Sequence, residues 1–256
     1  MGVADYLRFA MVDDGLSDKE ARARFWVIDK DGLLDSNRRD LSDAQKTYAR
    51  DSSELKNWPR NSRGQISLSE AITKLDATIL IGLSTVKGIF TESVIREMAK
   101  KTERPIIFPL SNPTSRSEAV PADLIEWTEG RALVATGSPF APVKYGGRSI
   151  EIAQCNNVFI FPAVGLGLLA SKARRVSDKM MLAAAKALGG QSPALKDPTA
   201  SLLPNVRTIR DIAREVAYAV ATQAHDEGLA PEFSQEKGRQ AVAENQWTPE
   251  YLVYSV

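Results

Sequence analysis

The stretch Pro105–Thr114, which reads PIIFPLSNPT, decides how the rest of the chain is interpreted. Its first six residues form an apolar run that begins at a proline, which is typical of a buried strand in a parallel sheet. Ser111 and Asn112 follow directly, so we expect them just beyond the carboxyl end of that strand, where open α/β sheets bind ligands. Pro113 favours an extended Asn112, whose amide offers two donors and one acceptor. The stretch is therefore either a ligand contact or an ordinary turn before proline.

The composition places the chain among ordinary globular proteins. It has 256 residues, 43% of them hydrophobic and 25% charged, which is enough to bury the core of one or two domains. The formal net charge of +1 gives no electrostatic reason to expect nucleic acid or an anionic membrane as a partner. No apolar run approaches the ~20 residues of a membrane span. The single cysteine, Cys155, excludes an internal disulfide and fits a reducing compartment.

Apolar runs that predict strands alternate with segments that predict helices. The predicted strands are Phe25–Ile28, Ala77–Gly82, Pro105–Leu110 and Ala132–Thr136, and the predicted helices between and before them are 3–13, 18–24, 67–74, 92–101 and 122–128. This alternation is the pattern of a doubly wound parallel sheet of the Rossmann type. Right-handed crossovers would bring the carboxyl ends of all the strands to one edge.

The remaining segments are assigned less regular roles. Residues 34–66 are polar and aperiodic, and we expect a long surface excursion there. Residues 158–162 are an apolar run that reads as a further buried strand, followed by expected helices at 164–173, 178–188 and 207–224. We divide the chain into a sheet domain, residues 1–188, and a helical C-terminal extension, residues 189–256.

Three polar positions are candidates for ligand contacts. Asp29 ends a predicted strand, where a carboxylate can accept hydrogen bonds from the hydroxyls of an adenosine ribose and repel a 2′-phosphate; it is otherwise a turn aspartate. Asn156 and Asn157 are adjacent amides that either hold a carboxylate or carboxamide or satisfy backbone groups at a strand end. No cluster has the spacing of metal ligands, and the one histidine, His225, offers no Ser-His-Asp arrangement.

Together these motifs resemble the NAD-binding domain of malic enzymes. The segments that carry the resemblance are Gly2–Ala4, Phe25–Leu34, Glu103–Thr114, Glu129–Arg131, Gly137–Phe140 and Asn156–Pro162. Their order and spacing match the family across Gly2–Leu188, and more loosely to the C-terminus.

The resemblance implies a function and a set of site residues. The family oxidises L-malate with NAD or NADP and decarboxylates the product to pyruvate and CO2, using Mg²⁺ or Mn²⁺. It implies that Asn112 and Asn156 contact malate or pyruvate and that Asp29 binds the cofactor ribose. The residues implied to line the cofactor cleft are Leu83, Ser84, Ser111, Gly137 and Asn157. It also implies a homo-oligomer in the cytoplasm or, in a eukaryote, in the mitochondrial matrix.

The departures from the family pattern define the expected limits of the chain. The catalytic tyrosine and lysine, the metal-binding carboxylates, the glycine-rich loop and the first sheet strand of the family have no counterpart here. We therefore expect no catalytic residue and no metal ligand in the chain, a sheet that is incomplete at its N-terminus, and no activity of the chain alone. Asp29 favours NAD, whereas Arg38, Arg39, Gln45 and Lys46 could favour NADP by binding a phosphate. The alternative is a non-catalytic module for nucleotide binding or subunit association.

Overall fold

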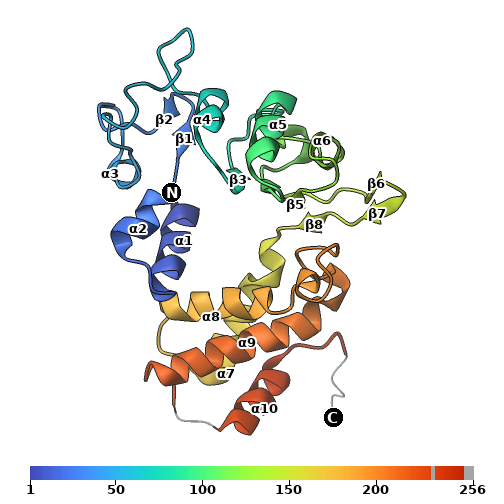
Figure 1. The fold of residues 1–256 in the computed structure, drawn as a ribbon. Helices are drawn as coiled ribbons and strands as arrows, with labels where there is room; N and C mark the ends of the chain where they lie inside the picture. Colours follow the sequence, from blue (N-terminus) through green and yellow to red (C-terminus); the bar gives the residue numbers. More distant parts are fainter. Residues whose placement is uncertain (232–233, 251–256) are drawn as a thin grey trace, which may run out of the picture. The chain divides into compact units, whose positions relative to one another are not determined.

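The computed structural model of the protein describes residues 1–231 and 234–250. The chain forms two compact units, Met1–Val134 and Ala135–Val256, and each is described by itself. Figure 1 shows the elements in chain order.

A four-stranded parallel sheet is the main β structure (Figure 1). Its strands follow the order β3 (Ile79–Gly82), β4 (Ile106–Pro109), β5 (Leu133–Thr136) and β8 (Ala153–Gln154). The helices α5 (Glu92–Lys101) and α6 (Pro121–Trp127) connect β3 to β4 and β4 to β5. The first three strands and both connecting helices confirm the sequence prediction of an α/β fold with a parallel sheet.

Local capping signals place the helices correctly. Thr91 accepts a hydrogen bond from the N–H of Val94 and begins α5, whose buried side chains lie at helical spacing. Ser17 and Glu20 form a capping box that begins α2 (Asp18–Ala23), which follows α1 (Gly2–Asp13). The two capped helices, α2 and α5, begin at the predicted residues, because a side-chain acceptor at the first turn is a strictly local signal.

The predicted strand Phe25–Ile28 is not part of the parallel sheet. Only Ile28–Asp29 forms a strand, β1, which pairs antiparallel with β2 (Gly32–Leu33). Gly32 has φ +100°, and a Cβ there would lie 2.9 Å from the carbonyl oxygen of Ile66. The tight turn through Gly32 therefore folds the chain back at once, and the backbone groups of β1 bond to β2.

The prediction that residues 34–66 form a surface excursion is wrong in part. These residues include the short helix α3 (Asp43–Lys46) and precede α4 (Leu68–Lys74). Leu55 and Ile66 lie buried with Leu33 and Ala71 in a small core. Trp26 stacks on Trp58 at its edge, with ring centroids 5.0 Å apart. The apolar residues of this segment have no regular spacing, so no periodicity reveals the core.

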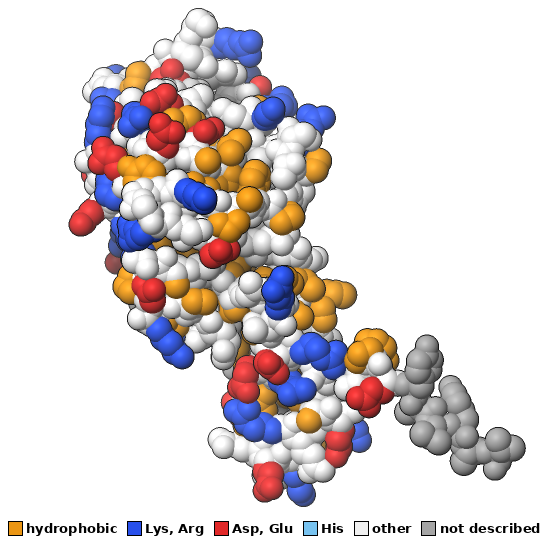
Figure 2. All heavy atoms as spheres, turned by 90° about the vertical axis from the view of Figure 1, so that its right-hand side faces the viewer, with side chains coloured by type: hydrophobic (Ala, Val, Ile, Leu, Met, Phe, Trp, Pro, Cys, Tyr) orange, Lys and Arg blue, Asp and Glu red, His pale blue; other side chains and the backbone are white. Residues whose placement is uncertain are grey.

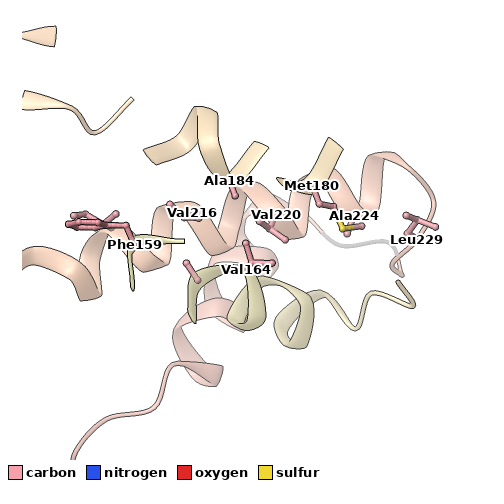
Figure 3. Close-up of a cluster of buried hydrophobic side chains, with 10 residues drawn as sticks. Phe159, Val164, Met180, Ala184, Val216, Val220, Ala224 and Leu229 are labelled. Carbon is pink, nitrogen blue, oxygen red and sulfur yellow. The ribbon is translucent and has the colours of Figure 1, made fainter. Parts of the chain in front are cut away.

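The second unit consists mainly of helices packed around one apolar core (Figure 3). The core side chains come from α7 (Phe161–Ser171), α8 (Asp178–Gly189), α9 (Ile209–Asp226) and the turn η2 (Asn157–Phe159), together with Leu229, which follows α9. The unit also contains the hairpin β6 (Val143–Tyr145)–β7 (Arg148–Ile150), the turns η3 (Pro193–Leu195) and η4 (Val206–Thr208), and α10 (Gln235–Asn245). A fourth such turn, η1 (Thr114–Arg116), belongs to the first unit.

The predicted strand at 158–162 is instead a 3-10 turn and the start of α7. The side chain of Asn156 accepts from the N–H of Val158 at 2.9 Å and begins the turn. Pro162 then occupies the first turn of α7, where its missing N–H costs nothing. A short apolar run does not distinguish a buried strand from a buried helix start.

The helices α7 and α9 approach closely at Gly167. A Cβ on Gly167 would lie 2.5 Å from the carbonyl oxygen of Ala217 and 2.9 Å from Cβ of Val220. Gly165, on the same helix, has nothing within 4 Å of its Cβ position. Only Gly167 is therefore required by the packing.

We predict that Gly167→Ala lowers the free energy of unfolding by about 1–3 kcal/mol, because the methyl group forces the two helices apart. Gly165→Ala is the matched control and should be neutral or stabilising by up to ~1 kcal/mol, because alanine favours helix. Urea denaturation of both variants measures the difference. Equal stabilities for the two variants would contradict the close approach.

Candidate functional site

Asp29 lies in a network of charges in the first unit. Its two carboxylate oxygens accept from the guanidinium of Arg38 at 2.8 and 2.9 Å, from Nε2 of Gln45 at 3.1 Å and from the N–H of Asp31 at 2.8 Å. A carboxylate has about four acceptor positions, so these bonds fill it. Burial alone would raise the pKa of Asp29, but the bonds from Arg38 and the Asp31 N–H hold that pKa below its ordinary value. Asp29 is therefore an anion that the protein itself saturates.

The guanidinium of Arg38 is equally occupied. Besides Asp29, it donates to the Gly32 carbonyl oxygen at 3.1 Å and to the two oxygens of Asp40 at 3.2 and 2.6 Å. These bonds account for all five N–H donors of an arginine. The side chain is 15% exposed. Arg38 does fold back beside Asp29, as the sequence allowed, but its donors are already used.

Ser84 and Ser111, both predicted to line a cofactor cleft, meet at one buried carboxylate. The side chain of Glu118 is fully buried. Its Oε1 accepts from the N–H and the hydroxyl of Ser84, both at 2.8 Å, and from the Ser111 hydroxyl at 2.5 Å. Its Oε2 accepts from the N–H of Ser111 at 3.2 Å. Glu118 thus joins the carboxyl ends of β3 and β4.

Glu118 is not among the site residues that the sequence predicts, although a local signal for its position exists. Burial alone would raise the pKa of Glu118, but the hydrogen bonds from Ser111 and Ser84 outweigh that effect and lower it. Gly82 makes the room: a Cβ there would lie 2.6 Å from Cδ of Glu118. A glycine that ends a strand, with a serine two residues later, indicates a close approach by another group, but the sequence does not show which group approaches.

Leu83 and Asn112 lie on the surface beside this buried cluster. Leu83 follows β3 and is 60% exposed, an unusual position for a large apolar side chain. Asn112 follows Ser111 and is exposed, and its peptide bond to Pro113 is cis. Both positions are accessible to a ligand.

Three predicted site residues lie in the second unit. Gly137 is buried directly after β5, and its carbonyl oxygen accepts from Nε2 of Gln154 at 3.3 Å. Asn156 is half-buried and uses its carbonyl oxygen to cap η2, so its NH2 group is the part that can donate to a ligand. Asn157 opens the same turn and is exposed.

Within residues 1–231 and 234–250, no group of three or more His, Cys, Asp or Glu side chains is arranged to hold a metal ion. The residues that the structure describes therefore do not fit a metal centre.

Across the same residues, no helix is both long enough and apolar enough to span a membrane. Figure 2 shows acidic and basic side chains interspersed on the face that it displays.

Parallel strands joined by helices, with small and polar residues directly after the strands, define a Rossmann-type α/β protein. The model of one family, described as malic enzyme, NAD binding domain, matches residues 1–225. The chain belongs to this family.

Similar proteins carry the same family name. The chain is 46% identical over 253 residues to the NAD-dependent malic enzymes of Acinetobacter baylyi and Edwardsiella ictaluri. These matches cover 99% of the chain but 44% and 45% of the two relatives, so the chain spans less than half of their length.

Solved structures agree on the fold. The crystal structure of Entamoeba histolytica malic enzyme matches with a TM-score of 0.64 and 26% identity, over 85% of this chain and 41% of that one. Malic enzyme from Pyrococcus horikoshii matches with a TM-score of 0.60 over 83% of this chain and 43% of that one; at 24% identity it supports the fold alone.

The network around Asp29 yields a prediction on stability. Arg38→Met should lower the free energy of unfolding at pH 7 by about 1–3 kcal/mol, because it removes charged hydrogen bonds from a partly buried carboxylate. Asp29 has a lowered pKa in the folded state, so its contribution is present above the unfolded-state pKa of about 3.9 and is lost as the pH falls through the folded-state value. The difference between wild type and variant should shrink below about pH 4.

Arg39→Met is the control, because Arg39 is the exposed neighbour. Surface substitutions usually change stability by less than about 0.5 kcal/mol. Urea titrations between pH 3 and 7, in steps of about half a unit, follow both variants across the unfolded-state pKa. A loss for Arg38→Met that does not depend on pH would contradict the assigned ion pair.

Proposed function

We propose that this chain is the NAD-binding part of an enzyme that oxidises L-malate and decarboxylates the product to pyruvate and CO2, with NAD and Mg²⁺ or Mn²⁺. The observation that carries the proposal is the family match over residues 1–225, supported by 46% identity to an NAD-dependent malic enzyme across nearly the whole chain. Because the chain spans 44% of that relative, the activity is proposed for a whole protein of that kind.

NAD would supply the hydride acceptor, and the protein would bind and orient it. We assign Asp29 to the adenosine ribose, and Leu83, Ser84, Ser111, Gly137 and Asn157 to the surroundings of the cofactor. The acceptor positions of Asp29 are filled, so a ribose hydroxyl would replace a present donor. Gln45 is the neutral one of the two side-chain donors, and its bond of 3.1 Å is the longest, so we propose that it yields.

Asn112 and Asn156 would orient the substrate. An amide NH2 donates to a carboxylate without titrating, so it holds malate in one pose over a wide pH range. Two observations support this assignment. Asn112 is exposed, and the Oδ1 atom of Asn156 accepts from the N–H of Val158, which leaves the NH2 group of Asn156 to donate to a ligand. The metal would polarise the reacting oxygens in such an enzyme, but its ligands are not proposed among the described residues.

Assembly and location are carried over from the family resemblance. We propose a homo-oligomer that works in the cytoplasm, because the relatives named above are bacterial. Light scattering on the purified protein tests the assembly.

A chimera tests the function directly. The chain replaces the matched region of the Acinetobacter baylyi enzyme, and the purified product is assayed with malate, Mn²⁺ and either NAD or NADP. We expect NADH formation and a higher kcat/KM with NAD than with NADP. The remainder of the relative without the insert is the control and should be inactive. A folded chimera without malate-dependent NADH formation would overturn the proposal.

We predict that Asn112→Ala and Asn156→Ala in this chimera each lower kcat/KM for malate roughly tenfold to hundredfold. This is the effect of losing one hydrogen bond to a charged group, about 1.5–3 kcal/mol. Steady-state kinetics with saturating NAD measure it.

Asn205 provides a matched control for Asn156. It caps η4 with the same kind of bond: its Oδ1 accepts from the N–H of Arg207, two residues later, at 2.9 Å. Asn205→Ala and Asn156→Ala should each cost about 0.5–2 kcal/mol of stability, but only the latter should impair turnover. If both variants keep wild-type kcat/KM in the folded fraction, Asn156 is a structural cap and not a substrate contact.

A further inference from the structure

Glu118 is a buried carboxylate to which the proposed function assigns no role. Among the described residues it is the one charged residue with no exposed surface, and its partners are the serine groups that follow β3 and β4. Burying an ionised carboxylate is costly unless the protein replaces its hydration. Its position between two strand ends therefore requires an explanation.

The protons of the Ser84 and Ser111 hydroxyls are used within the protein. Each donates its one proton to Oε1 of Glu118. Each also accepts a backbone N–H, Ser84 from Val86 at 3.1 Å and Ser111 from Thr85 at 2.9 Å. A hydroxyl has a single proton to donate, so neither serine can donate to a cofactor while the bonds to Glu118 hold.

The same carboxylate fixes the loop that follows β3, residues 83–88. Thr85 adopts φ +58°, a left-handed conformation that β-branched residues rarely take, so the surroundings must hold it there. The far end of the loop is tied to the segment that carries Glu118: Gly88 N–H donates to Ser117 and Phe90 N–H donates to the Glu118 carbonyl oxygen. The loop presents Leu83 and Val86, 60% and 51% exposed, to the outside.

We propose that Glu118 is a positioning residue for the dinucleotide cofactor: it fixes loop 83–88 and Ser111 so that Leu83 and the loop backbone, not the serine hydroxyls, form the cofactor-binding surface. The inference rests on the proposed function. In this proposal Ser84 and Ser111 support the cofactor-binding surface through their bonds to Glu118. An exposed leucine offers an apolar face on which a flat heteroaromatic ring can pack.

The experiment uses the chimera described above and a double-mutant cycle. Glu118→Gln replaces an acceptor with an NH2 group that faces serine donors, so the loop loses its anchor. We expect KM for NAD to rise about tenfold or more, while kcat falls less than about threefold. Ser111→Ala should raise KM for NAD by itself, but should add little in the Glu118→Gln background, because both changes break one cluster.

Thr128→Val is the matched control. Thr128 is fully buried, donates to the carbonyl oxygen of Leu124 at 2.7 Å and accepts from the N–H of Ala132 at 3.2 Å, all away from loop 83–88 in sequence. It should lower the melting temperature and leave KM for NAD unchanged. If Glu118→Gln does not fold, Ser84→Ala, which keeps the carboxylate, takes its place in the same cycle with a smaller expected rise.

The outcomes separate the two proposals. Equal KM values for NAD in Glu118→Gln and Thr128→Val would show that Glu118 only stabilises the fold, and would overturn this inference. A further rise in KM when Ser111→Ala is added would show that the hydroxyl contacts NAD itself, and would also overturn it. An inactive unsubstituted chimera would overturn the proposed function, and this inference with it.

Discussion

An ionised carboxylate without water has to be solvated by the protein, and the Glu118 side chain imposes that condition on the first unit. Four donors from two serines replace its hydration shell. They can converge only where the parallel strands β3 and β4 end side by side, and where Gly82 leaves space for the carboxylate. Burial of this one side chain therefore depends on the register of β3 and β4, on the glycine that ends β3, and on the loop that follows β3.

The sequence reveals those parts of the fold whose signals are local. Capping residues such as Ser17 and Thr91 begin their helices where predicted, because the hydrogen bond that they make spans only three residues. Short apolar runs are less decisive. The runs at β3, β4 and β5 are strands, whereas the run at 158–162 is a turn and a helix start, decided by the Asn156 cap and by packing on α9. The small core under residues 34–66 joins residues far apart in sequence, which no periodicity displays.

The candidate site shows the same limit at the level of single side chains. Motifs identified Ser84 and Ser111, but their hydroxyls are bonded to a glutamate 34 and 7 residues away. A motif records that a residue type is needed at a position; it does not record whether the side chain faces the ligand or supports a neighbour. The distinction depends on which donors and acceptors are already satisfied, and that can be counted only in three dimensions.

The number of donors and acceptors that are already occupied also bears on the choice between NAD and NADP. Near Asp29 the structure gathers three carboxylates, those of Asp29, Asp31 and Asp40, and two cations, those of Lys30 and Arg38, so one negative charge is left over. A 2′-phosphate would meet that charge, and the nearest guanidinium has no N–H left to offer it. To bind the phosphate, Arg38 would have to release Asp29, Asp40 or the Gly32 carbonyl oxygen, and the loss of either carboxylate would leave that carboxylate without its partner. A ribose with a free 2′-hydroxyl needs only the exchange of one neutral donor, Gln45. With the cofactor ribose at Asp29, as proposed, the arginine that in sequence looks like a phosphate ligand would therefore favour NAD, because four of its five N–H bonds go to carboxylates.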